Sequence, residues 1–342
     1  MAASWGSVFR RCSETDSNDH NKKHFAAVQF YDSIGVNLAM NATRKMLGSL
    51  VGLFVCCFVI PAFAADAPRA QHVFIISFDQ GNPDLIQKSD MPTFHQMVAQ
   101  GAHTWEAYTI VPSVTLPSHT SMLTGVGVQK HQITWNDYLP EKGLVKVPTI
   151  FALAKERGLV TAMFVGKEKF KHLDQPGSLD AFVWPRPEDN AKAVAKAFAE
   201  QVSNLKPNLC FIHFRDPDTV GHEYGAESPE KMKSLADCDE ALKTIKDAIG
   251  AAGLVDTSVI ILTADHGSHD IRNRQGKTVA THGSAESDDV LIPWVAWGKG
   301  VKKDFTVTAP VVQYDTAATA LWLLNVPLPE DFWGRPVTSA FE

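Results

Sequence analysis

The sequence predicts an α/β fold in which a mostly parallel central sheet carries helices on both faces. Two observations support this prediction. Short runs of Val, Ile, Leu and Phe alternate with segments of helical periodicity, and these runs are apolar throughout rather than at every second residue. Strands of that kind are buried on both faces, as in parallel sheets covered by helices. The composition, 45% hydrophobic and 20% charged, excludes collagen, a coiled coil and a wholly disordered chain.

Residues 1–64 are predicted to lie outside the folded domain. Arg44 and Lys45 precede an uncharged apolar run that ends in Pro61-Ala62-Phe63-Ala64. A basic start, an apolar stretch and an Ala-x-Ala site are typical of a secretory signal peptide, here with cleavage after Ala64. We therefore expect a periplasmic or secreted protein with one catalytic domain over 65–342.

An alternative for this segment is an uncleaved membrane anchor, because residues 46–65 are uncharged and long enough to span a bilayer. The protein would then be membrane-attached. Signal peptides begin near the start of a chain, so Met40 or Met46 is the expected first residue.

The first half of the expected domain alternates strand and helix. Residues 72–78 are mostly apolar and predict a buried strand, and 92–101 predicts a short helix with Pro near its start and Gly at its end. A second helix over 149–157 is stopped by Gly158 and leads into a strand over 160–165.

The second half repeats this alternation. An Ala-rich helix over 187–203 precedes a strand over 208–214. Ser228 is the expected N-cap of the clearest helix, 229–249, because Pro229 occupies the first helical position and apolar residues recur on one face. Strands over 256–263 and 290–297 and a helix over 314–324 complete the expected set.

Carboxylates and imidazoles follow the expected strands. Ligands of parallel sheets bind beyond the carboxyl ends of the strands, so these side chains should meet. A single Asp after a strand is commonly a helix cap or turn former, but repetition at four places favours a metal site. Three carboxylates and three imidazoles suit Zn²⁺, although other divalent metals are possible; they are Asp79, Asp218, His222, Asp265, His266 and His282.

Thr115 precedes a predicted helix start over 116–123. Free backbone N–H groups and the positive end of the helix dipole favour a phosphate there. The alternative is that Thr115 only caps the helix. A nearby metal would decide between the two, because a metal can hold a hydroxyl as its alkoxide.

In this order the motifs resemble the alkaline phosphatase superfamily, and within it the type I phosphodiesterase/nucleotide pyrophosphatase branch. The resemblance covers nearly all of 65–342. It implies an alkaline-phosphatase-like fold, a Thr115 nucleophile, and Asn136 as a ligand of a phosphoryl oxygen. It also implies two Zn²⁺, one held by Asp79, Thr115, Asp265 and His266 and the other by Asp218, His222 and His282.

The expected activity is hydrolysis of a small-molecule phosphoester through a phosphothreonine intermediate. The charge of two Zn²⁺ would balance three carboxylates and a Thr115 alkoxide, so an anionic substrate would meet no large repulsion. The formal net charge of −6 argues against a nucleic-acid-binding surface. The oligomeric state is left open.

Departures from the resemblance leave the substrate open. Only a short stretch separates His269 from His282, where related diesterases carry a long insertion, so we expect a more open site. Lys167 and Lys169 resemble a basic pair of phosphonoacetate hydrolases and some monoesterases, which would favour a phosphomonoester or phosphonate; the alternative is two lysines on a solvated helix start. His269 is interpreted as a loop histidine rather than a partner of the metal ligands.

Other activities and cysteine chemistry are less favoured. A sulfatase would need an oxidisable Cys or Ser, followed by Arg, where Thr115–His119 stands. Phosphoryl transferases of the superfamily usually carry additional domains, and a binding protein with a dead site is disfavoured by the complete ligand set. Cys210 and Cys238 are interpreted as two core cysteines rather than a disulfide.

Overall fold

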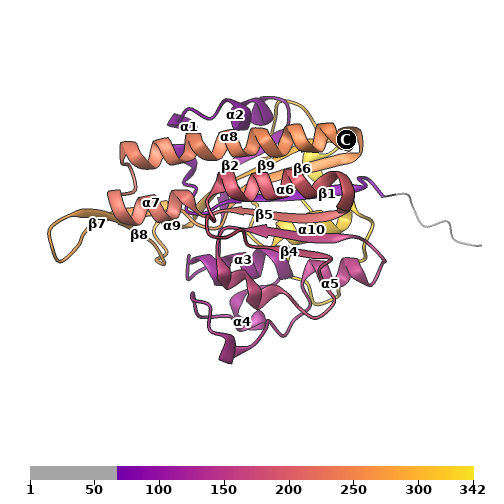
Figure 1. The fold of residues 1–342 in the computed structure, drawn as a ribbon, viewed down its shortest axis with the longest axis horizontal. Coiled ribbons are helices and arrows are strands. Elements are labelled where there is room, and N and C mark those ends of the chain that lie inside the picture. Colours follow the sequence, from indigo (N-terminus) through magenta and orange to yellow (C-terminus); the bar gives the residue numbers. More distant parts are fainter. Residues whose placement is uncertain (1–67) are drawn as a thin grey trace, which may run out of the picture. The chain divides into compact units, whose positions relative to one another are not determined.

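An eight-stranded sheet forms the centre of the computed structural model, which describes residues 68–342 (Figure 1). The signal peptide predicted over 1–64 and the starts expected at Met40 or Met46 lie outside the described residues. The strand order is β10-β2-β9-β6-β1-β5-β3-β4. The strands are β1 (His72–Phe78), β2 (Ala102–Tyr108), β3 (Thr161–Val165), β4 (Ala181–Val183), β5 (Leu209–Phe214), β6 (Ser258–Ala264), β9 (Leu291–Gly298) and β10 (Phe305–Thr306).

Most strand pairs are parallel, as predicted. Strands β6, β1, β5, β3 and β4 run in one direction, and only β9 is antiparallel to its neighbours β6 and β2. Strand β2 therefore points the same way as the parallel set. The carboxyl ends of β1, β2, β3, β5 and β6 consequently meet at one edge of the sheet.

Helices cover both faces (Figure 1). On β1, Phe74, Ile76 and Phe78 pack into the core under α1, α2, α6 and α8, whereas Val73 and Ile75 pack into the core under α3, α5 and α10. This alternation explains why the strand is apolar throughout. The helices are α1 (Pro83–Lys88), α2 (Pro92–Ala99), α3 (Thr115–Thr124), α4 (Val128–His131), α5 (Ile150–Lys155), α6 (Ala191–Leu205), α7 (Asp216–Tyr224), α8 (Pro229–Ala251), α9 (Ser287–Val290) and α10 (Asp315–Leu323).

Two boundaries differ from the predictions because a side chain caps the helix later than expected. Helix α6 begins at Ala191 rather than 187, since Asn190 accepts a hydrogen bond from the Ala193 N–H. Helix α5 begins after Thr149, whose hydroxyl accepts from the Ala152 N–H. Cys210 and Cys238 are both buried and unpaired, which confirms the prediction of core cysteines.

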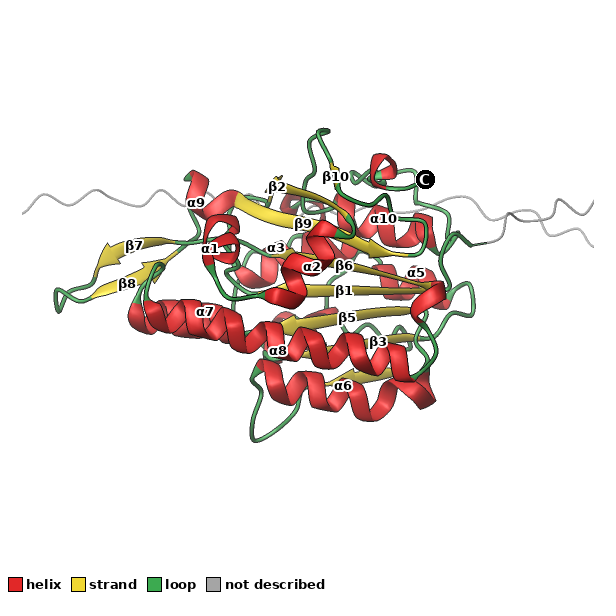
Figure 2. Cartoon of the chain, turned by 90° about the horizontal axis from the view of Figure 1, so that it is seen from above, coloured by secondary structure: helices red, strands yellow, loops and turns green. Residues whose placement is uncertain are grey.

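A two-stranded hairpin occupies the short stretch before His282. It consists of β7 (His269–Arg272) and β8 (Thr278–Thr281), which pair with each other and project away from the sheet (Figure 2). The sequence did not predict it, because its residues are mostly polar and exposed. Among the described residues, no helix combines the length and apolarity needed to cross a bilayer.

Candidate metal centre

Most of the predicted site residues follow the carboxyl ends of strands, whereas Asn136 follows helix α4. Asp79 comes directly after β1 and Asp265 directly after β6, while Thr115 is the first residue of α3. Helix α7, after β5, carries Asp218 and His222 one turn apart. His266 follows Asp265, and His282 follows β8. The topology thus explains how residues far apart in sequence meet.

One group of these residues is fully buried. Asp79, Asp265 and His266, here called the buried cluster, have 0% exposure and offer ligand atoms within 4.8 Å of one another. His266 Nε2 lies 3.2 Å from Asp265 Oδ2 and 3.6 Å from Asp79 Oδ1. Their strands β1 and β6 are neighbours whose last residues, Phe78 and Ala264, are in register. The central strands therefore set the geometry of this cluster.

A second group lies closer to solvent. Asp218, His222 and His282, here called the rim cluster, also offer ligand atoms within 4.8 Å of one another. His222 Nε2 lies 3.1 Å from Asp218 Oδ1 and 3.2 Å from His282 Nε2. The His222 side chain is 46% exposed. The rings of His266 and His282 stack with centroids 3.8 Å apart, so the two clusters adjoin.

All three histidines present the same nitrogen to the clusters. Their Nδ1 atoms lie 2.9–3.0 Å from backbone carbonyls, of Ala280 for His222, Gly267 for His266 and Ser113 for His282. A carbonyl can only accept, so each Nδ1 carries the proton and a neutral ring leaves its Nε2 lone pair toward the carboxylates. Histidine ligands of metals are commonly oriented in this way.

Lone pairs and carboxylates that face one another call for a cation. The Oδ2 atom of Asp265 is buried without a hydrogen-bond donor. Burial raises the pKa of Asp265 well above its ordinary range, and the adjacent Asp79 charge adds to this. Burial and His282 lower the pKa of His266 to about 3. The carboxylate oxygens and imidazole nitrogens of each cluster fit one divalent metal ion.

The hydroxyl of Thr115 lies beside the buried cluster. Its Oγ1 lies 3.4 Å from Asp79 Oδ1 and 3.5 Å from His266 Nε2. The N-cap position is taken by Val114, and the side chain of Thr115 is directed to the cluster, so the alternative that Thr115 only caps the helix is wrong. Asn136 is adjacent, because its Oδ1 accepts the Leu116 N–H at 2.8 Å. Its amide N–H₂ group thereby comes to the start of α3.

The ammonium of Lys167 lies between the two clusters. Its Nζ is 2.5 Å from Asp79 Oδ2, 2.7 Å from Asp218 Oδ2 and 3.4 Å from Thr115 Oγ1. Burial opposes ionisation of Lys167, but the charges of Asp218 and Asp79 raise its pKa above the ordinary value. The ammonium of Lys167 in turn holds the pKa of Asp79 well below its ordinary value. The alternative of a solvated helix start is wrong for Lys167, whose side chain is 15% exposed.

Lys169 and His269 lie outside the two clusters. Lys169 is half-buried in the 3₁₀ helix Glu168–Leu173, where burial and the Lys167 charge lower its pKa. His269 Nδ1 lies 2.8 Å from Asp289 Oδ1, and Asp289 also accepts hydrogen bonds from the Ser284 N–H and hydroxyl. His269 is the first residue of β7 rather than a loop residue, which corrects its interpretation as a loop histidine, and through Asp289 it supports the loop after His282.

Sequence reasoning missed four buried polar residues beneath the clusters. His213 Nε2 donates to Asp79 Oδ2 at 3.0 Å, and His119 Nδ1 donates to the Thr115 carbonyl at 2.8 Å. Gln80 contacts carboxylates of both clusters, and the fully buried Lys231 contacts Gln80. Burial lowers the pKa of Lys231 to about 8. The sequence offered one signal for these residues: His213 is a single polar residue within the apolar strand β5, which suggests a buried polar contact.

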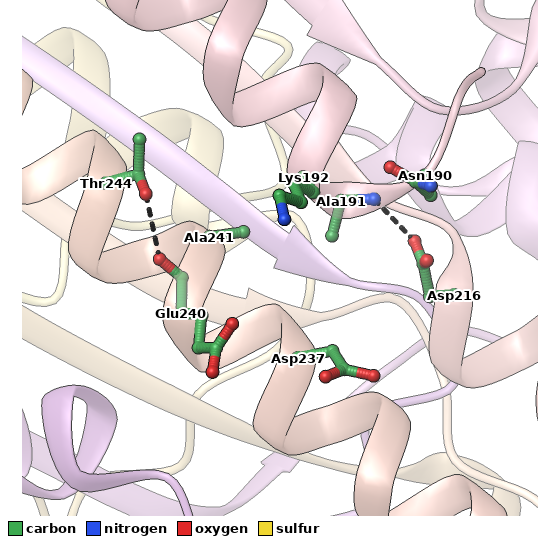
Figure 3. Close-up of a pocket in the computed structure, with 8 residues that line it drawn as sticks. All are labelled: Asn190, Ala191, Lys192, Asp216, Asp237, Glu240, Ala241 and Thr244. Atoms are coloured by element: carbon green, nitrogen blue, oxygen red, sulfur yellow. Dashed lines mark hydrogen bonds between the residues drawn. The ribbon is translucent and has the colours of Figure 1, made fainter.

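A cavity of about 310 Å³ lies elsewhere, between the start of α6 and α8 (Figure 3). Its charged lining is mainly acidic, from Asp216, Asp237 and Glu240, and Asp216 Oδ2 accepts the Ala191 N–H at 2.7 Å. Carboxylates repel phosphate, so this cavity does not suit a phosphoester. None of the predicted site residues lines it.

Comparisons with known proteins agree with the geometry. A model of the type I phosphodiesterase / nucleotide pyrophosphatase family matches residues 73–313. Ectonucleotide pyrophosphatase/phosphodiesterase family member 7 of Mus musculus is 24% identical over 261 residues, which are 68% of this chain and 58% of that protein. The chain thus spans less than two thirds of the length of this relative.

Two further proteins extend the comparison. GPI ethanolamine phosphate transferase 1 of Emericella nidulans is 25% identical over 260 residues, 70% of this chain and 27% of that protein. The structure of murine ectonucleotide pyrophosphatase/phosphodiesterase 5, an inactive threonine-to-alanine variant in complex with AMP, matches with a TM-score of 0.65 at 18% identity. That match covers 80% of this chain and 100% of the murine chain, and it shows the alkaline-phosphatase-like fold.

Proposed function

The chain belongs to the type I phosphodiesterase/nucleotide pyrophosphatase family, and on that premise we propose that it is a secreted, metal-dependent phosphoester hydrolase. The observation that carries the proposal is the position of the Thr115 hydroxyl, 3.4–3.5 Å from two members of the buried cluster. In the murine relative the variant described as inactive has alanine in place of a threonine, which supports the same role for Thr115.

The residues fit two divalent ions, one held by Asp79, Thr115, Asp265 and His266 and the other by Asp218, His222 and His282. When bound, such ions, which we expect to be Zn²⁺, supply Lewis acidity toward the nucleophilic oxygen and the oxygen of the leaving group.

The chain's own groups perform the displacement. Thr115 Oγ1 gives up its proton and bonds to phosphorus, the bond from phosphorus to the ester oxygen breaks, and the leaving oxygen takes up a proton, so that the leaving group departs as an alcohol. Water then gives up a proton and bonds to the phosphorus of this threonine ester, the bond from phosphorus to Oγ1 breaks, and the Thr115 hydroxyl re-forms. A diester substrate thereby yields a monoester, and a monoester substrate yields phosphate. His119 holds the Thr115 backbone, and Asn136 offers N–H donors to a phosphoryl oxygen.

One experiment tests this proposal on the purified protein. Turnover of bis(4-nitrophenyl) phosphate is measured together with metal content, and an adduct in which Thr115 carries the 4-nitrophenyl phosphoryl group is sought by mass spectrometry after acid quenching. We expect two bound ions per chain and a trapped peptide with this adduct. Turnover that persists undiminished in Thr115→Ala would overturn the mechanism.

A second candidate, hydrolysis of a phosphomonoester or phosphonate, is favoured by the basic pair. Lys167 Nζ lies 3.4 Å from Thr115 Oγ1, and Lys169 is two residues further on. A monoester dianion carries one more charge than a diester, so it gains more from nearby ammonium groups. Lys169→Ala should lower turnover of 4-nitrophenyl phosphate about tenfold while it leaves bis(4-nitrophenyl) phosphate nearly unchanged.

Lys171→Ala is the matched control, because Lys171 lies in the same 3₁₀ helix and pairs with Glu168. Equal effects of Lys169→Ala on both substrates would remove the case for a monoester. Transfer to an acceptor, as the name of the fungal relative describes for that protein, is tested by whether product forms in water alone.

Secretion is a proposal that rests on the signal peptide predicted over 1–64. N-terminal sequencing of the exported protein should give Ala65 as the first residue. A protein that stays in the membrane fraction with this segment attached would contradict cleavage.

A further inference from the structure

Gln80 contacts both clusters at once. It follows Asp79 at the end of β1 and is fully buried. Its backbone N–H donates to Asp265 Oδ1 at 3.0 Å, and its side-chain Nε2 donates to Asp218 Oδ1 at 3.0 Å. The same Asp218 oxygen lies 3.1 Å from His222 Nε2. One residue therefore holds a carboxylate of the buried cluster through its backbone and a carboxylate of the rim cluster through its side chain.

A buried lysine determines which way the Gln80 amide faces. Lys231, at the start of α8, has 0% exposure, and its Nζ lies 2.5 Å from Gln80 Oε1 and 3.0 Å from Ser268 Oγ. An ammonium group only donates, so the amide oxygen must face Lys231. The amide N–H₂ group then faces Asp218, which only accepts when ionised. The contacts with Lys231 and Asp218 together fix the orientation of the Gln80 amide.

The chain accommodates this side chain at some cost. Gln80 has a φ of 62°, in the left-handed region that residues other than glycine seldom adopt. On α7, between Asp218 and His222, a Cβ at Gly221 would lie 2.2 Å from Gln80 Oε1. Glycine at 221 is thus required for the amide to fit against the helix.

We propose that Gln80 is a positioning residue that holds Asp218 in place as a metal ligand and so completes the rim cluster. The inference rests on the proposed function, because it requires that both clusters bind metal. A replacement by glycine keeps the backbone N–H that contacts Asp265 but removes the amide that contacts Asp218. Loss of the side chain should therefore weaken the binding of the ion in the rim cluster and leave the binding of the ion in the buried cluster unchanged.

Gln80→Gly is the decisive variant, since glycine adopts this φ without backbone strain. Thermal unfolding of the variant is measured alongside, because loss of the amide leaves the buried Lys231 ammonium with Ser268 as its hydrogen-bond partner. Zinc affinity is measured on the full chain by competition with a chromophoric chelator, and stoichiometry by metal analysis. We expect the weaker-binding ion to lose affinity by about 10–100-fold, the range typical of residues that orient metal ligands, with the other ion within about twofold.

Gln132→Gly is the matched control. Gln132 has a nearly identical φ of 64° at the end of α4, its amide contacts only the nearby Gln129 carbonyl among the hydrogen bonds of the described residues, and it is exposed. The same substitution there should leave both affinities unchanged. Lys231→Met is an independent test, because it removes the ammonium group that orients the Gln80 amide. We expect a smaller loss of affinity for the same ion.

The outcomes separate this inference from the proposed function. If the unmodified chain binds fewer than two ions, the proposed function fails first. If it binds two ions and Gln80→Gly binds both with unchanged affinity, or loses both equally, the positioning role is overturned. A selective loss with Gln80→Gly, absent with Gln132→Gly, supports it.

Discussion

The two clusters use the same kinds of side chain but are built differently. The buried cluster lies at the ends of β1 and β6, two adjacent parallel strands in the middle of the sheet, and all of its members are fully buried. The rim cluster is assembled from α7 and the loop after the β7–β8 hairpin, and its His222 side chain is 46% exposed. The sheet thus fixes one half of the centre, whereas a helix and a loop place the other.

This difference indicates a division of roles. The proposed nucleophile, Thr115, contacts the buried cluster, where exclusion of water strengthens electrostatic interactions. We propose that the substrate enters and the leaving group departs on the side of the rim cluster, because its His222 side chain is exposed. The following predictions test this comparison.

The largest effect is expected from the nucleophile itself. Thr115→Ala should lower kcat for bis(4-nitrophenyl) phosphate by at least about 10³-fold, because it removes the oxygen proposed to attack phosphorus. Metal content should remain near two ions per chain. The matched control is Thr124→Ala, since the Thr124 hydroxyl on the same helix bonds only to the Thr120 carbonyl among the hydrogen bonds of the described residues.

Removal of one histidine from each cluster compares them directly. His266→Ala should lower kcat by about 10³-fold, because it removes a ligand 3.5 Å from Thr115 Oγ1. His222→Ala should cost about 10- to 100-fold, because the buried cluster and nucleophile remain intact. Steady-state kinetics with metal analysis measures both. Equal losses would show that the clusters do not differ in role.

Removal of metal should proceed in two steps. A chelator such as EDTA should take the ion of the rim cluster at least about tenfold faster, because His222 is exposed while Asp79, Asp265 and His266 are fully buried. Metal analysis of samples quenched at intervals follows the process, and the first ion alone should account for the fast loss of activity. Loss of both ions in a single phase would contradict the comparison.

The smallest effect is expected from the support of the rim loop. His269→Ala removes the contact to Asp289, which in turn holds Ser284 just beyond His282. Turnover should fall only about twofold, since Asp289 keeps its hydrogen bonds to Ser284. A loss as large as that of His222→Ala would instead place His269 among the residues that orient the metal ligands.

Much of the candidate centre followed from local sequence patterns. The strands after which Asp79, Asp218 and Asp265 stand are largely apolar and alternate with helices, so their type and direction were predictable. Parallel strands bring their carboxyl ends to one edge, and this rule accounts for Asp79, Asp265 and the start of α7, whereas His282 follows the β7–β8 hairpin outside the central sheet. Helix boundaries were less accurate because caps such as Asn190 depend on single hydrogen bonds.

The sequence by itself therefore determined the fold class, the family resemblance and the residue types of the site. Tertiary structure alone decided the split into a buried and a rim cluster, the place of Lys167 between them and the link through Gln80 to Lys231. The physical reason is that periodicity records which face of an element is buried. It carries no information on which buried polar atoms meet across the packed elements, and packing settles that.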